Sequence, residues 1–132
     1  MSENPVTIPE SYRDLLDRPL YGHLATVRPD GTAQVNPMWF FFDGTYLKFT
    51  HTRTRQKFRN LAANPSAAMS VADPDRPYRY LEVRGVLERV EADPEGRFYQ
   101  ELSTRYGGNG QAPPDAADRV ILWIRPTAVS KQ

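Results

Sequence analysis

Residues 45 to 65 read TYLKFTHTRTRQKFRNLAANP, a segment in which a short strand runs into a cationic helix. Polar and apolar side chains alternate over Thr45–Phe49, which is typical of a strand. From Arg55 onward, apolar residues recur at intervals of three and four and predict a helix. Thr54 is the expected N-cap, and Asn64-Pro65 is the stop signal. The segment therefore predicts a strand, a polar turn and a helix in succession.

Four cations crowd the start of this helix, namely Arg53, Arg55, Lys57 and Arg59. Positive charge in the first turn opposes the helix macrodipole by about 0.3–1 kcal/mol per charge, and Arg55 and Arg59 repel each other at i, i+4. A bound anion would offset both costs. Free N–H groups at a helix start and the nearby threonine hydroxyls suit a phosphate. A solvated basic helix face explains the same charges, so both interpretations stay open.

Composition excludes several function classes. The chain of 132 residues has no cysteine, which rules out disulfides, iron–sulfur ligation and cysteine nucleophiles. Its two histidines, His23 and His51, show no metal-ligand spacing, so no metal site is expected. We expect His23 to be structural, and His51 to be either a plain loop residue or a group that contacts a bound ligand or moves a proton.

Charge and hydropathy limit the possible cellular location and the possible partners of the protein. A net charge of +1 is too small for a general nucleic-acid binder, so the basic cluster is local. The sequence has no apolar run long enough for a membrane span and no signal-peptide pattern at its start. We therefore expect a cytoplasmic protein without nucleic-acid partners.

The remaining sequence predicts one domain over residues 1–132, with residues 1–8 as a loose leader. The expected strands are Gly22–Val27, Thr32–Phe42, Thr45–Thr50, Ser66–Val71, Tyr78–Val90 (bent at Gly85) and Arg119–Ile124. Turn signals at Arg28–Gly31 and Asp43-Gly44 join neighbouring strands. Short helices are expected at Pro9–Asp17 and from Asp93-Pro94 to Tyr106. The fold class is mainly β (α+β): a six-stranded antiparallel barrel with a few short helices.

Two further segments have more than one interpretation. The run Trp39-Phe40-Phe41-Phe42 is expected to supply core and dimer interface. Gly107–Ala117 is either a lid on the substrate side or a plain connection. The aromatic run is rich enough that we expect a homodimer.

Four motifs appear in a familiar order: GHLATVRPDG (residues 22–31), QVNPMWF (34–40), TRQKFRNLAANP (54–65) and EVRG (82–85). With them the chain resembles the pyridoxamine 5'-phosphate oxidase-like split β-barrel superfamily, and within it the deazaflavin (coenzyme F420)-dependent oxidoreductase branch. The resemblance covers roughly residues 10 to 130. It implies the FMN-binding split-barrel fold and a homodimer with two cofactors in the grooves between subunits.

The resemblance also implies a cofactor, most often coenzyme F420 with FMN as the alternative. The residues it assigns to the cofactor are Asn36, Pro37 and Met38 along the ring system, Thr50, Thr52, Arg53, Arg55 and Lys57 at the phosphate, and Tyr78 and Tyr80 from the other subunit. Pyridoxamine-phosphate oxidases carry a C-terminal Arg-Leu-x-Pro-type pattern, which this sequence lacks before Lys131-Gln132. Vitamin oxidase activity is therefore not expected.

The residues themselves agree with a cofactor enzyme, because no nucleophile, metal set or paired carboxylates are visible and a hydride carrier does its own chemistry. Three classes stay open: an F420-dependent reductase of a small unsaturated molecule, an FMN-binding oxidoreductase, and a non-catalytic cofactor- or haem-binding protein. The cationic track Arg53–Arg59 suits the polyglutamate tail of F420 better than the single phosphate of FMN. Catalytic residues are not identified; Tyr78, Tyr80 or solvent is the candidate proton source.

Overall fold

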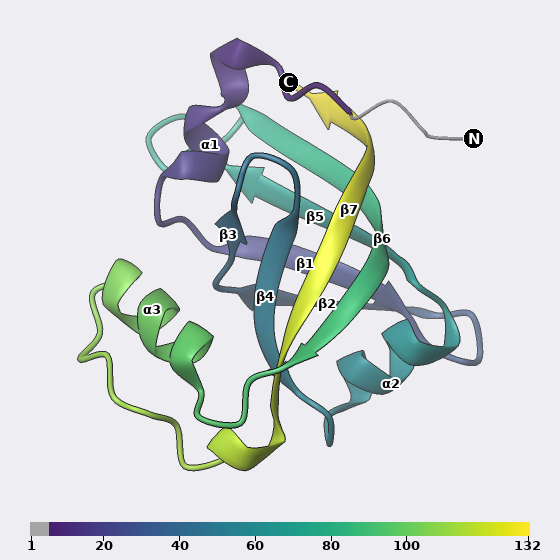
Figure 1. The fold of residues 1–132 in the computed structure, drawn as a ribbon. Helices are drawn as coiled ribbons and strands as arrows, with labels where there is room; N and C mark the ends of the chain where they lie inside the picture. Colours follow the sequence, from purple (N-terminus) through teal and green to yellow (C-terminus); the bar gives the residue numbers. More distant parts are fainter. Residues whose placement is uncertain (1–5) are drawn as a thin grey trace.

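The computed structural model describes residues 6–132, and Figure 1 shows one curled sheet with short helices at its margins. The strands are β1 (Gly22–Val27), β2 (Ala33–Met38), β3 (Phe41–Phe42), β4 (Leu47–Thr52), β5 (Ser66–Ala72), β6 (Tyr80–Ala92) and β7 (Arg119–Lys131). The helices are α1 (Asp14–Asp17), α2 (Gln56–Ala63) and α3 (Arg97–Arg105), with 3-10 turns η1 (Glu10–Tyr12) and η2 (Ala116–Asp118). Of the expected leader, residues 1–5 lie outside the described residues, and 6–8 belong to no helix or strand.

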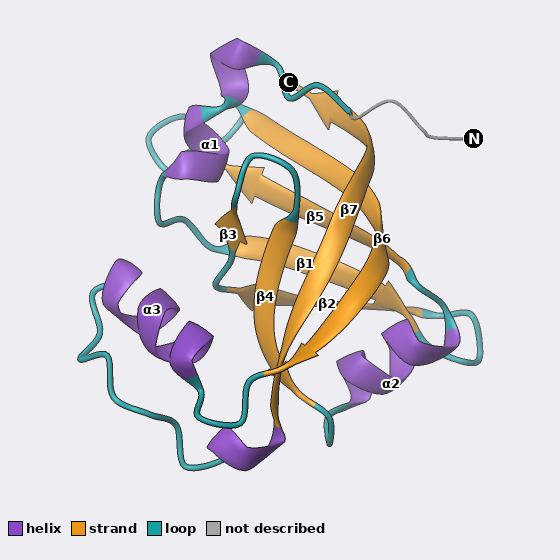
Figure 2. Ribbon diagram, in the orientation of Figure 1, coloured by secondary structure: helices purple, strands orange, loops and turns teal. Residues whose placement is uncertain are grey.

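The strands form one antiparallel sheet in the order β2-β1-β5-β6-β7-β4-β3. The two longest strands, β6 and β7, pair along most of their length and join the halves of the sheet (Figure 2). Their register shifts between Arg84 and Gly85 and again between Leu87 and Arg89. A Cβ at Gly85 would lie 2.5 Å from the carbonyl oxygen of Arg125, so this close approach requires glycine. These bulges bend the sheet into the expected split-barrel shape.

The mainly β split barrel is confirmed, but it has seven strands where six were expected. The difference arises within the expected strand Thr32–Phe42, which breaks at Trp39 and Phe40 into β2 and β3. The hydroxyl of Tyr106 accepts a hydrogen bond from the Phe40 N–H (3.1 Å), so this donor is not available to a strand partner. Phe40 itself is fully buried. At this point the chain passes from β2, at one edge of the sheet, to β3, at the other edge.

The core fills the inside of the curl with aliphatic and aromatic side chains from every strand except β2. Its largest fully buried members are Phe40, Phe49, Leu15, Leu16, Leu24, Leu47, Leu61, Met69, Leu81, Leu122 and Ile124. Leu15 and Leu16 come from α1, and Leu61 is the buried apolar residue of α2. Packing rather than intrinsic propensity therefore holds these short helices, since isolated helices of this length are marginal in water.

Helix ends differ from the sequence expectation at two places. The N-cap of α2 is Arg55 rather than Thr54, and no side chain caps the helix; Asn64 ends it as expected. α3 starts at Arg97, after Gly96 in the left-handed conformation (φ 65°), so Pro94 is not its first residue. Asp93 still caps α3, because its carboxylate accepts the N–H groups of Arg97 and Phe98, both at 3.0 Å.

Two findings bear on the function classes. No helix within residues 6–132 has the length and apolar character needed to cross a membrane. In the same part of the chain, no group of three or more potential ligand side chains is arranged to hold a metal ion.

Candidate functional site

A concave pocket of about 720 Å³ lies where the start of α2 meets β2, β4 and α3. The side chains that line it are Tyr21, Gln34, Asn36, Pro37, Met38, Trp39, Thr50, His51, Arg55, Gln56, Lys57, Tyr99 and Arg119. Arg55 and Lys57 line the pocket on its α2 side, while Trp39 and Tyr99 line it on the α3 side together with Arg119. A pocket of this size and mixed lining is typical of a cofactor or small-molecule site.

Lys57, at the cationic end, is unusual for a lysine because it is only 5% exposed. Its Nζ donates to Asn36 Oδ1 at 3.0 Å and contacts Met38 Sδ at 3.6 Å. Neither Lys57 nor Arg55 forms an ion pair with any carboxylate of residues 6–132. Burial lowers the pKa of Lys57, and the nearby Arg55 lowers it further. A buried cation without a carboxylate partner is suited to receive an anionic ligand.

The backbone reinforces this preference for an anion. Within residues 6–132 no side chain caps the start of α2, so its first N–H groups can bind a ligand at the positive end of the helix dipole. The Thr50 hydroxyl stands close by on β4 and accepts from Arg119 Nη1 at 3.4 Å. Thr50, Arg55 and Lys57 thus bring hydrogen-bond donors to one pocket, and their binding of a phosphate stays a prediction.

His51 is a buried residue of β4 rather than the loop residue that the sequence favoured. It is 6% exposed and shares the core-facing alternation of Leu47 and Phe49. Burial, and then the positive charges of Lys57 and Arg55, lower its pKa to about 4. Its Nε2 is buried without a hydrogen-bond partner in residues 6–132. His51 is therefore neutral near pH 7 and adds no positive charge to the pocket.

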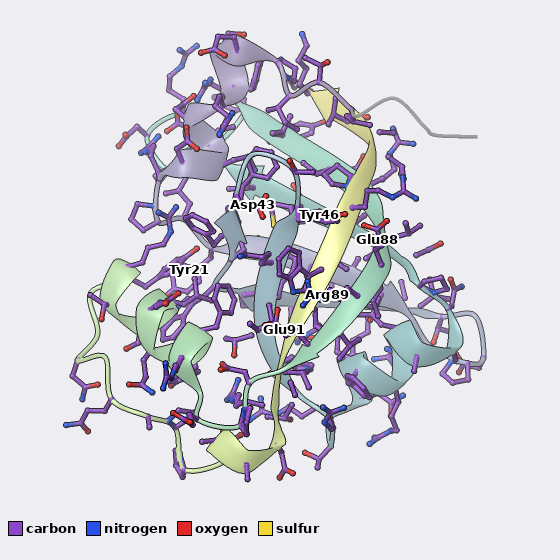
Figure 3. All side chains as sticks on the ribbon, viewed as in Figure 1. Tyr21, Asp43, Tyr46, Glu88, Arg89 and Glu91 are labelled. Carbon is purple, nitrogen blue, oxygen red and sulfur yellow. The ribbon has the colours of Figure 1, made fainter. Side chains whose placement is uncertain are left out.

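The opposite end of the pocket is aromatic. Trp39 stacks on Tyr106 with ring centroids 5.4 Å apart and lies 5.6 Å from Tyr99 of α3. The guanidinium of Arg119 lies 4.7 Å from the centre of the Tyr99 ring. Tyr21, labelled beside α3 in Figure 3, packs at 5.7 Å against Tyr106. This end offers flat apolar walls, which suit a planar ring system.

The pocket brings together six of the residues expected at a cofactor: Asn36, Pro37, Met38, Thr50, Arg55 and Lys57. Thr52 is not among them, because it is buried and its hydroxyl pairs with that of Thr54 at 3.3 Å. Arg53 is an exposed residue of the turn after β4 and does not line the pocket.

Tyr78 and Tyr80 also lie outside the pocket of their own chain. Tyr78 stands in the turn before β6, not on the strand, and is 83% exposed; it borders a separate hollow beside η1. Tyr80 is the first residue of β6. The expected strand start at Tyr78 is therefore wrong, while the role of both tyrosines across a subunit boundary stays a prediction.

Several lining residues were not assigned from the sequence. Gln34 lies two residues before Asn36 on β2, so strand alternation places it on the same face and was a usable signal. Gln56 adjoins two assigned cations. Tyr99 and Arg119 lie far along the chain on α3 and β7, and no local pattern connects them to the phosphate segment.

Comparison with known proteins adds a family and several structural relatives. The family model described as pyridoxamine 5'-phosphate oxidase matches residues 8–132. A solved structure named "F420 Reductase" is 64% identical, has a TM-score of 0.92, and aligns over 95% of this chain and 100% of its own. No curated protein matches the chain.

More distant structures share the fold. A conserved hypothetical protein from Mycobacterium tuberculosis is 22% identical with a TM-score of 0.74, over 99% of this chain and 88% of its own. General Stress Protein 26 from Bacillus anthracis str. Sterne is 22% identical with a TM-score of 0.70, over 92% of this chain and 91% of its own. Their agreement confirms the architecture.

Proposed function

This chain belongs to the pyridoxamine 5'-phosphate oxidase family, and we propose that it is a coenzyme F420-dependent oxidoreductase. The reaction proposed is hydride transfer between the reduced deazaflavin and a small unsaturated organic substrate. The observation that carries the proposal is the buried Lys57, which has no carboxylate partner in residues 6–132 and stands beside the uncapped start of α2. The name of the 64% identical relative, "F420 Reductase", favours the deazaflavin over FMN.

The residues present fit such a cofactor. Arg55, Lys57 and Thr50 would hold its phosphate, because they supply charge and hydroxyl donors next to free N–H groups. Asn36 and Met38 would lie along the ring system. The exposed Arg53, on the same cationic track, would face an anionic tail that runs out of the pocket. That tail is the feature that distinguishes F420 from FMN.

The chemistry that the reduced deazaflavin supplies when bound is hydride donation. The protein's own part is to hold the acceptor molecule within about 3–3.5 Å of the donor carbon and to keep water away. Trp39 and Tyr99 provide flat walls for both tasks. Solvent, or Tyr78 or Tyr80 of a second copy, would return the proton to the product.

We also propose a homodimer, although the aromatic run Trp39–Phe42 supports it less strongly than the sequence suggested. Phe40 and Phe42 are buried within one chain, so the aromatic run exposes less surface than expected. Trp123 is also covered by its own chain. The ring centroid of Tyr46 lies 5.3 Å from that of Trp123, and the Arg89 guanidinium lies 4.8 Å from the centre of the Trp123 ring. Tyr46 and Arg89 are labelled in Figure 3. Tyr78 is highly exposed and lies outside the pocket of its own chain, so it would reach such a pocket only in a second copy.

Titration of the purified protein with F420 and with FMN tests the cofactor. We expect F420 to bind more tightly, and the double variant Arg55→Ala, Lys57→Ala to lose that binding. FMN binding more tightly than F420 would contradict the proposal.

Stopped-flow oxidation of bound reduced F420 by a panel of enones, quinones and tetrapyrroles tests the reaction. We expect at least one acceptor to oxidise it faster than the protein-free rate, and Tyr78→Phe and Tyr80→Phe to lower that rate only modestly. If no acceptor does so, a carrier role replaces the reductase. Sedimentation at micromolar concentration tests the dimer, and a monomer would count against the shared site.

A further inference from the structure

A chain of hydrogen bonds along the pocket wall joins α2 to β2. In every bond the donor lies on the Arg59 side and the acceptor on the Asn36 side. Arg59 Nη2 donates to Gln56 Oε1 at 2.9 Å, and Gln56 Nε2 donates to Asn60 Oδ1 at 2.7 Å. Asn60 Nδ2 then donates to Gln34 Oε1 at 3.0 Å and to Thr26 Oγ1 at 3.1 Å. A guanidinium has donors only, so each amide that follows Arg59 must present its oxygen toward Arg59 and its nitrogen onward.

The chain ends on Asn36. Gln34 Nε2 donates to Asn36 Oδ1 at 3.2 Å, and Lys57 Nζ donates to the same oxygen at 3.0 Å. An ammonium group also has donors only, so Lys57 independently requires the oxygen of Asn36 to face it. Two donors therefore converge on Oδ1 from different elements, and the orientation of the Asn36 amide is fixed from both sides.

The orientation of the Asn36 amide decides which of its atoms is left for a ligand. Asn36 lines the pocket, and its Nδ2 has no hydrogen-bond partner in residues 6–132. Asn60, by contrast, is fully buried with its amide nitrogen and oxygen both bonded, and it does not line the pocket. Asn60 can thus influence a ligand only through the side chains it bonds: Gln34, which leads to Asn36, and Gln56, which lines the pocket itself.

From this geometry we propose that Gln34 and Asn60 are positioning residues that hold the Asn36 amide with its Nδ2 donor toward the pocket. The wall beside Lys57 then offers donors alone, and the ligand must present an accepting atom there, such as a carbonyl or phosphate oxygen. This selectivity rests on the proposed function for the identity of the ligand, but the orientation of Asn36 does not.

The test therefore begins with isotope-labelled, cofactor-free protein and inorganic pyrophosphate as the probe, followed by NMR of the side-chain amides. In the wild type, the amide protons of Asn36 should shift on titration, because they face the pocket. Gln34→Glu reverses the last step. Its carboxylate only accepts and should also pair with the Lys57 ammonium, which then no longer holds the Asn36 oxygen, so Asn36 should turn its Nδ2 toward residue 34. Its amide protons should then shift in the free protein and no longer respond to pyrophosphate.

Two uncharged variants separate positioning from general damage. Gln34→Met keeps the length of the side chain but removes the donor to Asn36, and it should weaken pyrophosphate binding roughly three- to tenfold. Thr26→Val is the matched control, since it removes the other partner of Asn60 and leaves the chain to Asn36 intact. It should respond like the wild type even if its melting temperature falls.

The proposal is overturned if the Asn36 amide of Gln34→Glu matches that of the wild type, or if Thr26→Val weakens binding as much as Gln34→Met. Failure of pyrophosphate to bind the wild type would count instead against the phosphate site of the proposed function. The free-protein amide shift between wild type and Gln34→Glu would still decide the orientation of Asn36.

Discussion

Replacing Lys57 with methionine should weaken ligand binding and stabilise the free protein, two effects of opposite sign from one change. Methionine has a similar length and suits the nearly closed site, where Lys57 is 5% exposed. The ammonium group loses water on burial, and its hydrogen bonds in residues 6–132 are those to Asn36 Oδ1 and Met38 Sδ. The site therefore holds a cation whose full interaction requires a ligand.

The sizes of the two effects follow from these contacts. Losing a charge-assisted hydrogen bond costs about 1.5–3 kcal/mol, so an anionic ligand should bind roughly 10- to 150-fold more weakly. In the free protein, the same bond to Asn36 is lost, but a desolvation penalty of several kcal/mol disappears with the charge. We expect the free energy of unfolding to rise by about 1–2 kcal/mol. That corresponds to an increase in Tm of about 3–8 °C.

Calorimetry of F420 or pyrophosphate binding, with urea unfolding of the ligand-free protein, measures both quantities. Lys48→Met is the matched control, because Lys48 lies against Trp123 and does not line the pocket. It should leave the affinity unchanged.

The pH dependence gives a second check. Since the pKa of Lys57 is lowered from its ordinary value of 10.5, the unfolded chain holds this proton more tightly than the folded one. Wild-type stability should therefore rise as the pH increases from the lowered pKa toward 10.5, and the advantage of Lys57→Met should shrink over the same range. A variant that loses stability while binding the ligand as tightly as the wild type would refute this reasoning.

Two further predictions concern other buried polar groups. His51→Gln should remove an acid-sensitive part of the stability: with a pKa of about 4 in the folded state against an ordinary 6.5, wild type should lose about 2 kcal/mol between pH 7 and pH 5. Urea unfolding at both pH values measures this, and equal slopes for the two proteins would contradict it. Asp93→Ala should lower the free energy of unfolding by about 1–2 kcal/mol, because two N–H groups of α3 lose their acceptor. The exposed neighbour Glu95→Ala should cost about 0.5 kcal/mol or less, and similar losses for both would show that Asp93 is not the cap.

Local patterns in the sequence were sufficient to predict the fold class. Alternation over Gly22–Val27 and Ser66–Val71 and the turn signals at Arg28–Gly31 and Asp43-Gly44 correspond to β1, β5 and the turns after β1 and β3. The bend at Gly85 was also readable, because an isolated glycine in a long alternating strand marks a bulge or a close backbone approach. These features depend on residues adjacent in the chain, which is why they could be read without a structure.

Another boundary depended on a distant contact. The break between β2 and β3 involves the Tyr106 hydroxyl, which lies 66 residues from Phe40 in sequence, and no local rule anticipates it. The start of α3 differs, because its cap is local: Asp93 accepts the N–H of Arg97 only four residues along the chain, and the sequence already pointed to Asp93. Only at the β2–β3 break did a tertiary hydrogen bond decide where a regular element ends.

For the candidate site, the sequence by itself identified the cationic segment, because its charge and spacing are local properties, while the residues along β2 were implied only by the resemblance to a known family. Only the tertiary structure decided that Lys57 is buried, that His51 Nε2 lies buried with no hydrogen-bond partner among residues 6–132, and that Tyr99 and Arg119 complete the wall. The physical reason is the antiparallel pairing of β4 with β7, which sets Arg119 opposite Thr52 just before α2, and the contact of Arg119 with Tyr99, which places α3 at the same site. Burial and hydrogen-bond direction arise from that juxtaposition, and a linear pattern contains neither.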